Sequence, residues 1–240
     1  MQFIDTHFHL DYYQDHAYWY KKINELKQYT LCVTNSPGIF HSCKQLYSET
    51  QYIKFAVGYN PQQSIIDPFS QKFFQAELQN TNYIGEVGLD FSKHYKSTQK
   101  EQIDIFSFIC ELAAQKNKLL SVHSRKAEKE TLDILLKNKV TRAIIHWYSG
   151  DIETFLSFLE AGYYFSVNAS MCTTQKGQTI VSKIPPNRLL IESDGPFSKV
   201  LGKRYVPLNL SEVYTIVETT TGYQNLKKIV WENFKELLTK

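Results

Sequence analysis

The sequence predicts an α/β fold, a single closed (β/α)8 barrel spanning all 240 residues. Two observations lead to this prediction. Eight short segments rich in β-branched and aromatic residues alternate with longer segments of helical pattern, and several of the short segments are nearly continuous apolar runs. Such runs are typical of strands buried on both faces of a parallel sheet, and eight strands each followed by a helix match a barrel. An open doubly wound sheet is the alternative, because periodicity does not distinguish closure from openness.

The sequence also predicts where individual helices and strands begin and end. Thr98 and Glu101 have the spacing of a capping box at the start of one helix, and Asp151 is expected to cap another helix that Gly162 closes. Further helices are expected over Lys126–Asn138, Asn209–Thr220 and Asn225–Leu238. The expected strands are Phe3–Asp5, Thr30–Asn35, Ile53–Tyr59, Tyr83–Leu89, Leu119–His123, Arg142–His146, Tyr163–Asn168 and Leu189–Ser193. Because no linker or repeat interrupts them, residues 1–240 are expected to form one domain.

Composition excludes several classes of protein. With 42% hydrophobic and 21% charged residues the chain is not intrinsically disordered, and a net charge of +3 is too small for wholesale capture of nucleic acid. No apolar run reaches the roughly 18–20 residues that span a bilayer, and no secretory signal pattern is present. A cytoplasmic location is therefore expected, with free thiols at Cys32, Cys43, Cys110 and Cys172.

Metal-binding types of side chain follow the expected strands. In a barrel the carboxyl ends of the strands form the face where catalytic groups gather. His7 and His9 are two residues apart, so in an extended segment they project to the same side, about 6.6 Å apart. Four other strands end in further ligand types: Glu86, His123, His146 and Asp194. Burying these groups together is costly unless they are paired or bind metal, so a metal site is expected. Asp90 is interpreted as an outer hydrogen-bond acceptor or a turn residue rather than a distant ligand.

Six segments resemble the TatD family of metal-dependent deoxyribonucleases, within the amidohydrolase-like barrels: FIDTHFHLD, VGYNP, YIGEVGLDF, LLSVHSRKAE, IIHWYSGD and RLLIESDGPF. The resemblance implies a single TIM-like barrel of the metal-dependent hydrolase type that cleaves phosphodiester bonds in DNA. HWYSG, YYFSVNASM and ESDGPF further resemble QatD, the TatD-like member of Qat anti-phage defence systems. That narrower resemblance implies a role in antiviral defence with other Qat subunits as partners.

The family pattern, carried over residue by residue, implies two metal sites bridged by Glu86, with His7, His9 and Asp194 at one and His123 and His146 at the other. Four imidazoles suit Mn²⁺ or Zn²⁺ better than Mg²⁺, although Mg²⁺ is expected to support activity. Asn60 stands where the family usually has a histidine, which puts a substrate contact there in doubt.

The expected mechanism follows from the charge of a phosphodiester, whose oxygens repel hydroxide. Two cations about 3.5–4 Å apart would activate water and stabilise the leaving oxygen. Glu86 and Asp194 are the expected catalytic residues, with Asp194 as general base. The candidate substrate contacts are phosphate-binding Arg125, Lys203 and Arg204, base-stacking Trp147 and Phe197, and Asn60. The structural alternatives are an ion pair from Arg125 to Glu128, a solvated charge pair at 203–204, and simple packing of the aromatic rings.

The reaction class has three alternatives. The first is a nuclease, expected to trim single-stranded DNA ends. The second is an amide or ester hydrolase with the same barrel, against which the absence of a strand-four lysine argues. The third is a catalytically weak regulatory subunit of a defence complex.

Overall fold

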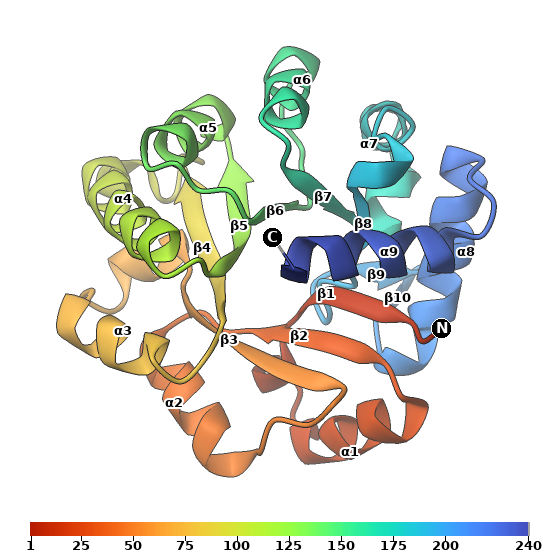
Figure 1. The fold of residues 1–240 in the computed structure, drawn as a ribbon, viewed down its shortest axis with the longest axis horizontal. Coiled ribbons are helices and arrows are strands. Elements are labelled where there is room, and N and C mark those ends of the chain that lie inside the picture. The colour runs from red at the N-terminus through yellow and green to blue at the C-terminus, as the bar shows by residue number, and fades with distance from the viewer. Residues whose placement is uncertain (240) are drawn as a thin grey trace. The chain divides into compact units, whose positions relative to one another are not determined.

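A computed structural model describes residues 1–239, in which strands and helices alternate along the chain (Figure 1). The strands are β1 Ile4–Phe8, β2 Tyr29–Val33, β3 Ile53–Tyr59, β4 Tyr83–Asp90, β5 Leu119–Arg125, β6 Ala143–His146, β7 Tyr164–Val167, β8 Leu189–Ile191, β9 Lys199–Val200 and β10 Lys203–Arg204. The helices are α1 His16–Leu26, α2 Pro37–Leu46, α3 Gln71–Leu78, α4 Gln99–Gln115, α5 Glu128–Lys137, α6 Ile152–Glu160, α7 Gln175–Val181, α8 Leu210–Thr221 and α9 Leu226–Thr239. The 3-10 helices used below are η1 Leu10–Tyr12, η2 Pro61–Ile65 and η3 Lys96–Thr98.

The sheet has the strand order that the alternating pattern predicts. Its eight strands follow one another in chain order from β1 to β8, and the pairs β1–β2, β4–β5 and β7–β8 are parallel. The first strand, expected over Phe3–Asp5, extends further, because Phe8 still pairs with Cys32 and keeps the backbone extended through His7. The remaining expected strands agree with the structure to within two residues at each end.

The described residues form two compact units, and the single domain expected for 1–240 stays a prediction. The first unit comprises residues 1–32, 48–54 and 164–239, and the second comprises 33–47 and 55–163. No helix among residues 1–239 is long and apolar enough to cross a membrane. All four cysteines are buried, and none of them forms a disulfide bond.

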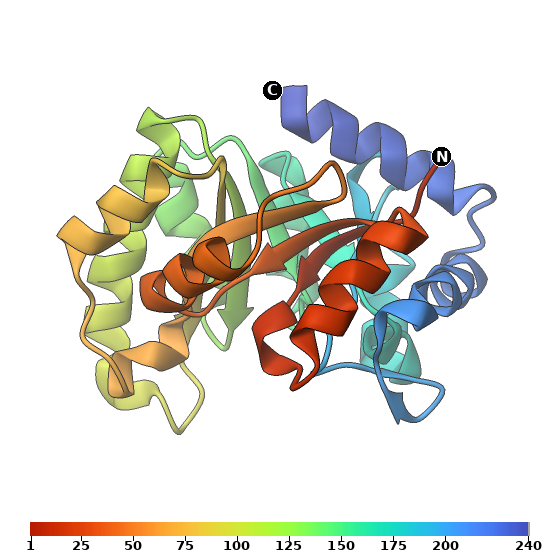
Figure 2. The same cartoon turned by 90° about the horizontal axis from the view of Figure 1, so that it is seen from below.

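In the first unit β8 lies beside β1. The Asp194 amide donates to the His7 carbonyl at 2.9 Å, and Phe8 forms a parallel bridge with Gly195. Helix α9 packs against both strands (Figure 1), where Asn233 donates to the Leu189 carbonyl at 2.8 Å. Figure 2 shows the N-terminus of the chain near the start of α9. These contacts fix the end of β1 against the segment that follows β8.

In the second unit α4 and α5 lie side by side outside β4 and β5 (Figure 1). The expected capping box at Thr98 is wrong. Thr98 ends η3 with ψ 14°, outside the extended conformation a cap needs, and its hydroxyl donates to the Tyr95 carbonyl. Asp151 does cap α6, since its Oδ1 accepts from the Thr154 amide at 2.8 Å, and Gly162 ends that helix with φ 84°.

Candidate metal centre

Within residues 1–239, each unit contains a buried group of histidine and carboxylate side chains. The first, which we call the β1–β8 triad, consists of His7, His9 and Asp194. The Nε2 atoms of His7 and His9 are 3.2 Å apart, and Asp194 Oδ1 lies 3.7 Å and 3.5 Å from them, respectively. All three residues are at most 5% exposed. The two imidazoles therefore converge on one carboxylate away from bulk water, as the spacing in the sequence predicts.

Backbone contacts between β1 and the segment after β8 hold this triad. The Asp194 amide donates to His7, and the His9 amide donates to the Gly195 carbonyl at 2.9 Å. Asp5 joins the same two segments, because its Oδ1 accepts from the amides of Ser193 at 2.8 Å and of His7 at 3.3 Å. Burial raises the pKa of Asp5 to about 7, against these hydrogen bonds, which lower it.

The second group, the β4–β6 triad, consists of Glu86, His123 and His146. Glu86 Oε1 lies 2.8 Å from His123 Nδ1 and 3.0 Å from His146 Nε2, and these two nitrogens are 3.4 Å apart. Glu86 is 4% and His146 6% exposed, while the His123 side chain is 14% exposed. One carboxylate oxygen thus faces two imidazole nitrogens.

Asp90 lies behind His123. Its Oδ2 is 3.4 Å from His123 Nε2 and accepts from Gln62 Nε2 at 3.0 Å, while its Oδ1 accepts from the Ser92 amide at 2.9 Å. Burial opposes ionisation of Asp90, but the close imidazole of His123 and the hydrogen bonds from Ser92 and Gln62 outweigh it and hold the pKa of Asp90 below its usual range. An ionised Asp90 favours a proton on Nε2 of His123. That leaves Nδ1, the atom facing Glu86, as a lone-pair donor. Asp90 therefore has the outer position interpreted from the sequence.

Both triads fit a divalent cation. With metal–ligand bonds near 2.1 Å, neighbouring ligand atoms in octahedral or tetrahedral sites lie about 3.0–3.4 Å apart. Within the triads these distances run from 2.8 Å to 3.7 Å, and in each triad the three donor atoms lie within 4.8 Å of one another. Nitrogen and oxygen donors in this combination suit Mn²⁺ or Zn²⁺.

The predicted substrate contacts of the second unit have different surroundings. Asn60 is buried, and its Oδ1 accepts from the Gln62 amide at 2.9 Å, so its side chain caps η2. Arg125 is exposed at the end of β5, and Glu128, its expected alternative partner, accepts from the Lys126 amide instead. Trp147 is half-buried and directly follows the ligand-type His146. Any contact of these residues with substrate stays a prediction.

Of the predicted contacts of the first unit, Phe197 lies beside the β1–β8 triad. Phe197 is 51% exposed, and its ring centroid lies 5.2 Å from that of His9. Lys203 and Arg204 are exposed on β10, and Arg204 Nη2 donates to the Tyr12 carbonyl at 3.3 Å. Sequence reasoning missed Gln62. The only available signal was the Asn60–Pro61 pair, which marks the start of a turn.

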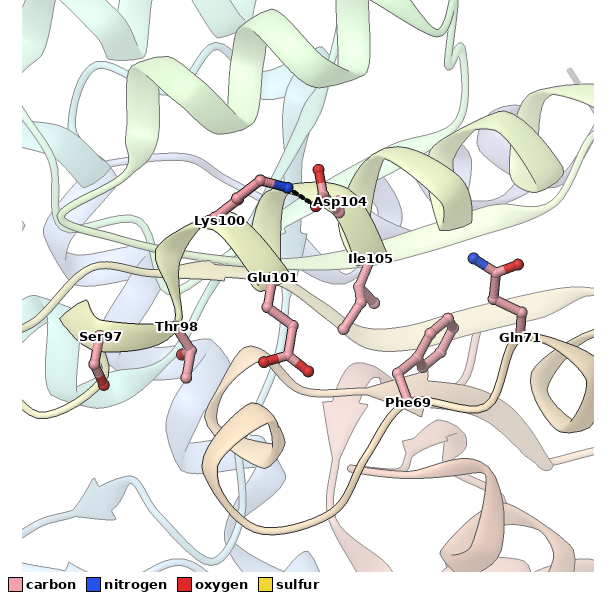
Figure 3. A pocket seen from close by; sticks show the side chains of 8 residues that line it. All are labelled: Phe69, Gln71, Ser97, Thr98, Lys100, Glu101, Asp104 and Ile105. Atoms are coloured by element: carbon pink, nitrogen blue, oxygen red, sulfur yellow. Dashed lines mark hydrogen bonds and ion pairs between the residues drawn. The ribbon is translucent and has the colours of Figure 1, made fainter.

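A separate hollow of the second unit lies outside both triads. It has a volume of about 430 Å³ and is lined by residues before α3 and at the start of α4 (Figure 3): Phe69, Gln71, Ser97, Thr98, Lys100, Glu101, Asp104 and Ile105. Its lysine is paired with Asp104 at 2.6 Å. Because none of its lining residues belongs to a triad, the hollow contributes no candidate metal ligand.

Comparison with known proteins places the chain in a family. The family described as TatD related DNase matches residues 4–239. The chain is 26% identical over 257 aligned positions to the uncharacterized metal-dependent hydrolase YcfH of Escherichia coli K12, covering 99% of this chain and 96% of that protein. It is 29% identical over 166 positions to the mouse putative deoxyribonuclease TATDN3, covering 65% of this chain and 55% of that protein.

Solved structures confirm the fold. The TatD homologue YJJV of Escherichia coli superposes with a TM-score of 0.87 at 20% identity, covering 98% of this chain and 97% of that chain. A TatD family hydrolase of Entamoeba histolytica gives 0.80 at 15% identity, covering 99% and 98%. The predicted (β/α)8 barrel is thus confirmed. Because the family match spans nearly the whole sequence, the chain is a hydrolase of the TatD-related DNase family.

Proposed function

We propose that this chain is a metal-dependent nuclease that hydrolyses phosphodiester bonds at the ends of single-stranded DNA. The observation that supports the proposal best is the pair of buried triads, each with two imidazoles and one carboxylate. Family membership supports the reaction class, and the mouse relative is named as a putative deoxyribonuclease. A net charge of +3 is consistent with a substrate held locally at the site.

Each triad is proposed to hold one divalent cation. His7, His9 and Asp194 would hold one, and Glu86, His123 and His146 the other. A cation bound at such a site lowers the pKa of a bound water and offsets the charge of the phosphodiester. Mn²⁺ or Zn²⁺ is the proposed native ion, with Mg²⁺ able to support activity, and the bridging role expected for Glu86 stays a prediction.

The chain's own residues have distinct roles in this proposal. Asp194 turns Oδ1 toward the two imidazoles of its triad, so its second oxygen is the proposed acceptor of the proton from the attacking water. Asp90 orients His123, and Asp5 holds the end of β1 against the segment that carries Asp194. Exposed Arg125 and Arg204 are proposed to bind phosphate oxygens.

The test is hydrolysis of end-labelled single-stranded DNA with Mn²⁺, Zn²⁺ or Mg²⁺, with and without EDTA. We expect release of nucleotides that EDTA abolishes and that His123→Asn and His146→Asn reduce at least 100-fold. His94→Asn is the matched control, because His94 is exposed and belongs to neither triad. Hydrolysis of amide or ester substrates without DNA cleavage would favour the second reaction class, and cation binding without any turnover would favour a regulatory subunit.

A place in a Qat-type anti-phage system is proposed on the resemblance of three sequence segments alone, and a cytoplasmic location is proposed on the composition of the chain and its scattered cysteines. Association with the products of neighbouring defence genes, measured by co-purification from the native host, tests the first proposal, and fractionation of the native cells tests the second. Loss of phage resistance on replacement of Asp194 would add support, and unchanged resistance would argue against the defence role.

A further inference from the structure

Two exposed aromatic rings lie at the edge of the β1–β8 triad. Tyr12 ends η1 and is 42% exposed, and Phe197 lies in the segment after β8 and is 51% exposed. Their ring centroids are 4.8 Å apart, with an angle of 67° between the ring planes. Large aromatic side chains of this kind are usually buried, so an exposed pair in mutual contact needs an explanation.

Both rings also contact the imidazole of His9. The centroid of the His9 ring lies 5.6 Å from that of Tyr12 and 5.2 Å from that of Phe197, and both contacts are edge-to-face. His9 itself is 1% exposed. The three rings therefore form one continuous aromatic surface, which we call the aromatic step. At its inner end it reaches a triad residue, and at its outer end it meets solvent.

The aromatic step is fixed to the triad by the backbone. The Tyr12 amide donates to the His9 carbonyl at 3.3 Å, and the Phe197 amide donates to the Asp194 carbonyl at 2.8 Å. Each exposed ring is thus only three residues from a triad residue and is tied to it by a tight turn. Little conformational freedom is left to lose when a flat ligand binds against these rings.

Positive charge borders the step. Arg204 Nη2 donates to the Tyr12 carbonyl at 3.3 Å, and its guanidinium lies 5.5 Å from the centroid of the Tyr13 ring. Flat rings beside cationic groups are the combination that binds single-stranded nucleic acid, because bases stack on the rings while phosphates face the charges.

We propose that the aromatic step is a nucleobase-stacking subsite for the nucleotide next to the scissile phosphate. This inference rests on the proposed nuclease function and adds the residues that would hold the base of an unpaired nucleotide, Tyr12 and Phe197. A base can stack on Tyr12 and Phe197 only after it has left its own helix, which a frayed or single-stranded end allows at little cost. Since every base has a π-face, the subsite should tolerate all four bases.

The first test measures binding without turnover. A short oligonucleotide with 2-aminopurine at its terminal position is titrated with the full chain in EDTA, and stacking is read as quenching of the fluorescence. We expect quenching with the natural chain and its loss in Phe197→Leu and Tyr12→Leu, which keep apolar bulk but remove the ring. Loss of stacking should weaken binding by about 5–150-fold. Tyr18→Leu is the matched control, because Tyr18 is 51% exposed on α1 and has no contact with His9 among the ring contacts of the described residues.

The second test replaces the terminal base with an abasic sugar. The natural chain should bind the abasic end as weakly as Phe197→Leu binds the normal end. Phe197→Leu should bind the abasic end no more weakly than the natural chain does. Equal affinity of the natural chain for both ends, or quenching that survives both substitutions, overturns the inference and indicates that the rings only shield His9.

The two proposals can fail separately. If DNA is hydrolysed but Phe197→Leu cleaves normal and abasic ends at the rates of the natural chain, the stacking subsite is refuted and the nuclease stands. If no DNA is hydrolysed with any of the three cations, the nuclease is refuted, and the fluorescence result in EDTA alone then decides whether the step binds bases.

Discussion

Replacement of Asp90 by asparagine should weaken cation binding without removing a ligand. Asp90 Oδ2 faces two donors, Gln62 Nε2 at 3.0 Å and His123 Nε2 at 3.4 Å. If the asparagine keeps its oxygen on the Ser92 amide, its NH₂ group faces those two atoms. An amide donor facing His123 Nε2 favours the other tautomer, with the proton on the Nδ1 atom that lies 2.8 Å from Glu86. His123 would then have to change tautomer before Nδ1 could bind a cation.

The expected magnitude follows from this loss of one oriented ligand among three. Substitution of groups that orient metal-binding histidines typically lowers affinity about 10–100-fold, or about 1.4–2.7 kcal/mol. The side-chain amide of Gln62 also loses its acceptor, but Gln62 is only half-buried, so the loss of unfolding free energy should stay below the about 1–3 kcal/mol of a fully buried group. The chain should therefore stay folded while its β4–β6 triad binds more weakly.

The assay is calorimetric titration of the metal-free chain with Mn²⁺ in a His9→Ala background, which leaves the β4–β6 triad as the intact one. Asp104→Asn is the matched control, since Asp104 is an exposed carboxylate on α4 that forms an ion pair with Lys100 and lies in neither triad. Circular dichroism confirms folding of each variant. An affinity of Asp90→Asn within threefold of the Asp104→Asn control would refute the tautomer reasoning.

Three further predictions concern catalysis and stability. Asp194→Asn should keep the fold and most of the bound metal but lower the rate of DNA hydrolysis by at least 100-fold, so a near-normal rate would show that Asp194 is not the base. Gly88→Ala should lower the unfolding free energy by about 3 kcal/mol or more, because φ is 139° and the added Cβ would lie 2.0 Å from the His123 carbonyl oxygen. The melting temperature changes by about 2–4 °C per kcal/mol, so a value within 2 °C of the natural chain would contradict this prediction. Asp151→Ala should cost about 1 kcal/mol at neutral pH by removing the cap of α6. The hydrogen bond from the Thr154 amide lowers the pKa of Asp151, so the stabilisation by this cap is present above the ordinary pKa of an aspartate and is lost as the pH falls through the lowered value. A stability difference between Asp151→Ala and the natural chain that persists at pH 2 in chemical denaturation would argue against this assignment.

Local pattern explains which parts of the fold and site were predictable. Buried strands such as β5 and β6 are apolar runs in the sequence, and an apolar run indicates a buried segment without any knowledge of the rest of the fold. Asp151 and Gly162 act within a few residues of themselves, so their roles at the ends of α6 were readable. The capping prediction at Thr98 was wrong because the preceding turn η3 sets the backbone of Thr98, and the capping motif does not report that turn.

The residues that form the triads could also be predicted from the sequence, since both their residue types and their positions at the ends of expected strands are visible there. Their division into two groups of three was implied by family resemblance. The catalytic and metal-binding roles themselves stay predictions. Asn60 was singled out by the family resemblance, and its capping of η2 was visible only in the structure; its contact with substrate stays a prediction.

By itself, then, the sequence determined the alternation of strands and helices, the parallel sheet and the set of candidate ligands, because these depend on residue type and short spacing. Only the tertiary structure decided that Gln62 supports Asp90 behind His123, and that Tyr12 and Phe197 meet over the His9 ring. Those contacts join segments far apart in the chain. Their existence depends on the register of strands and the rotamers of side chains, which no periodicity along the sequence encodes.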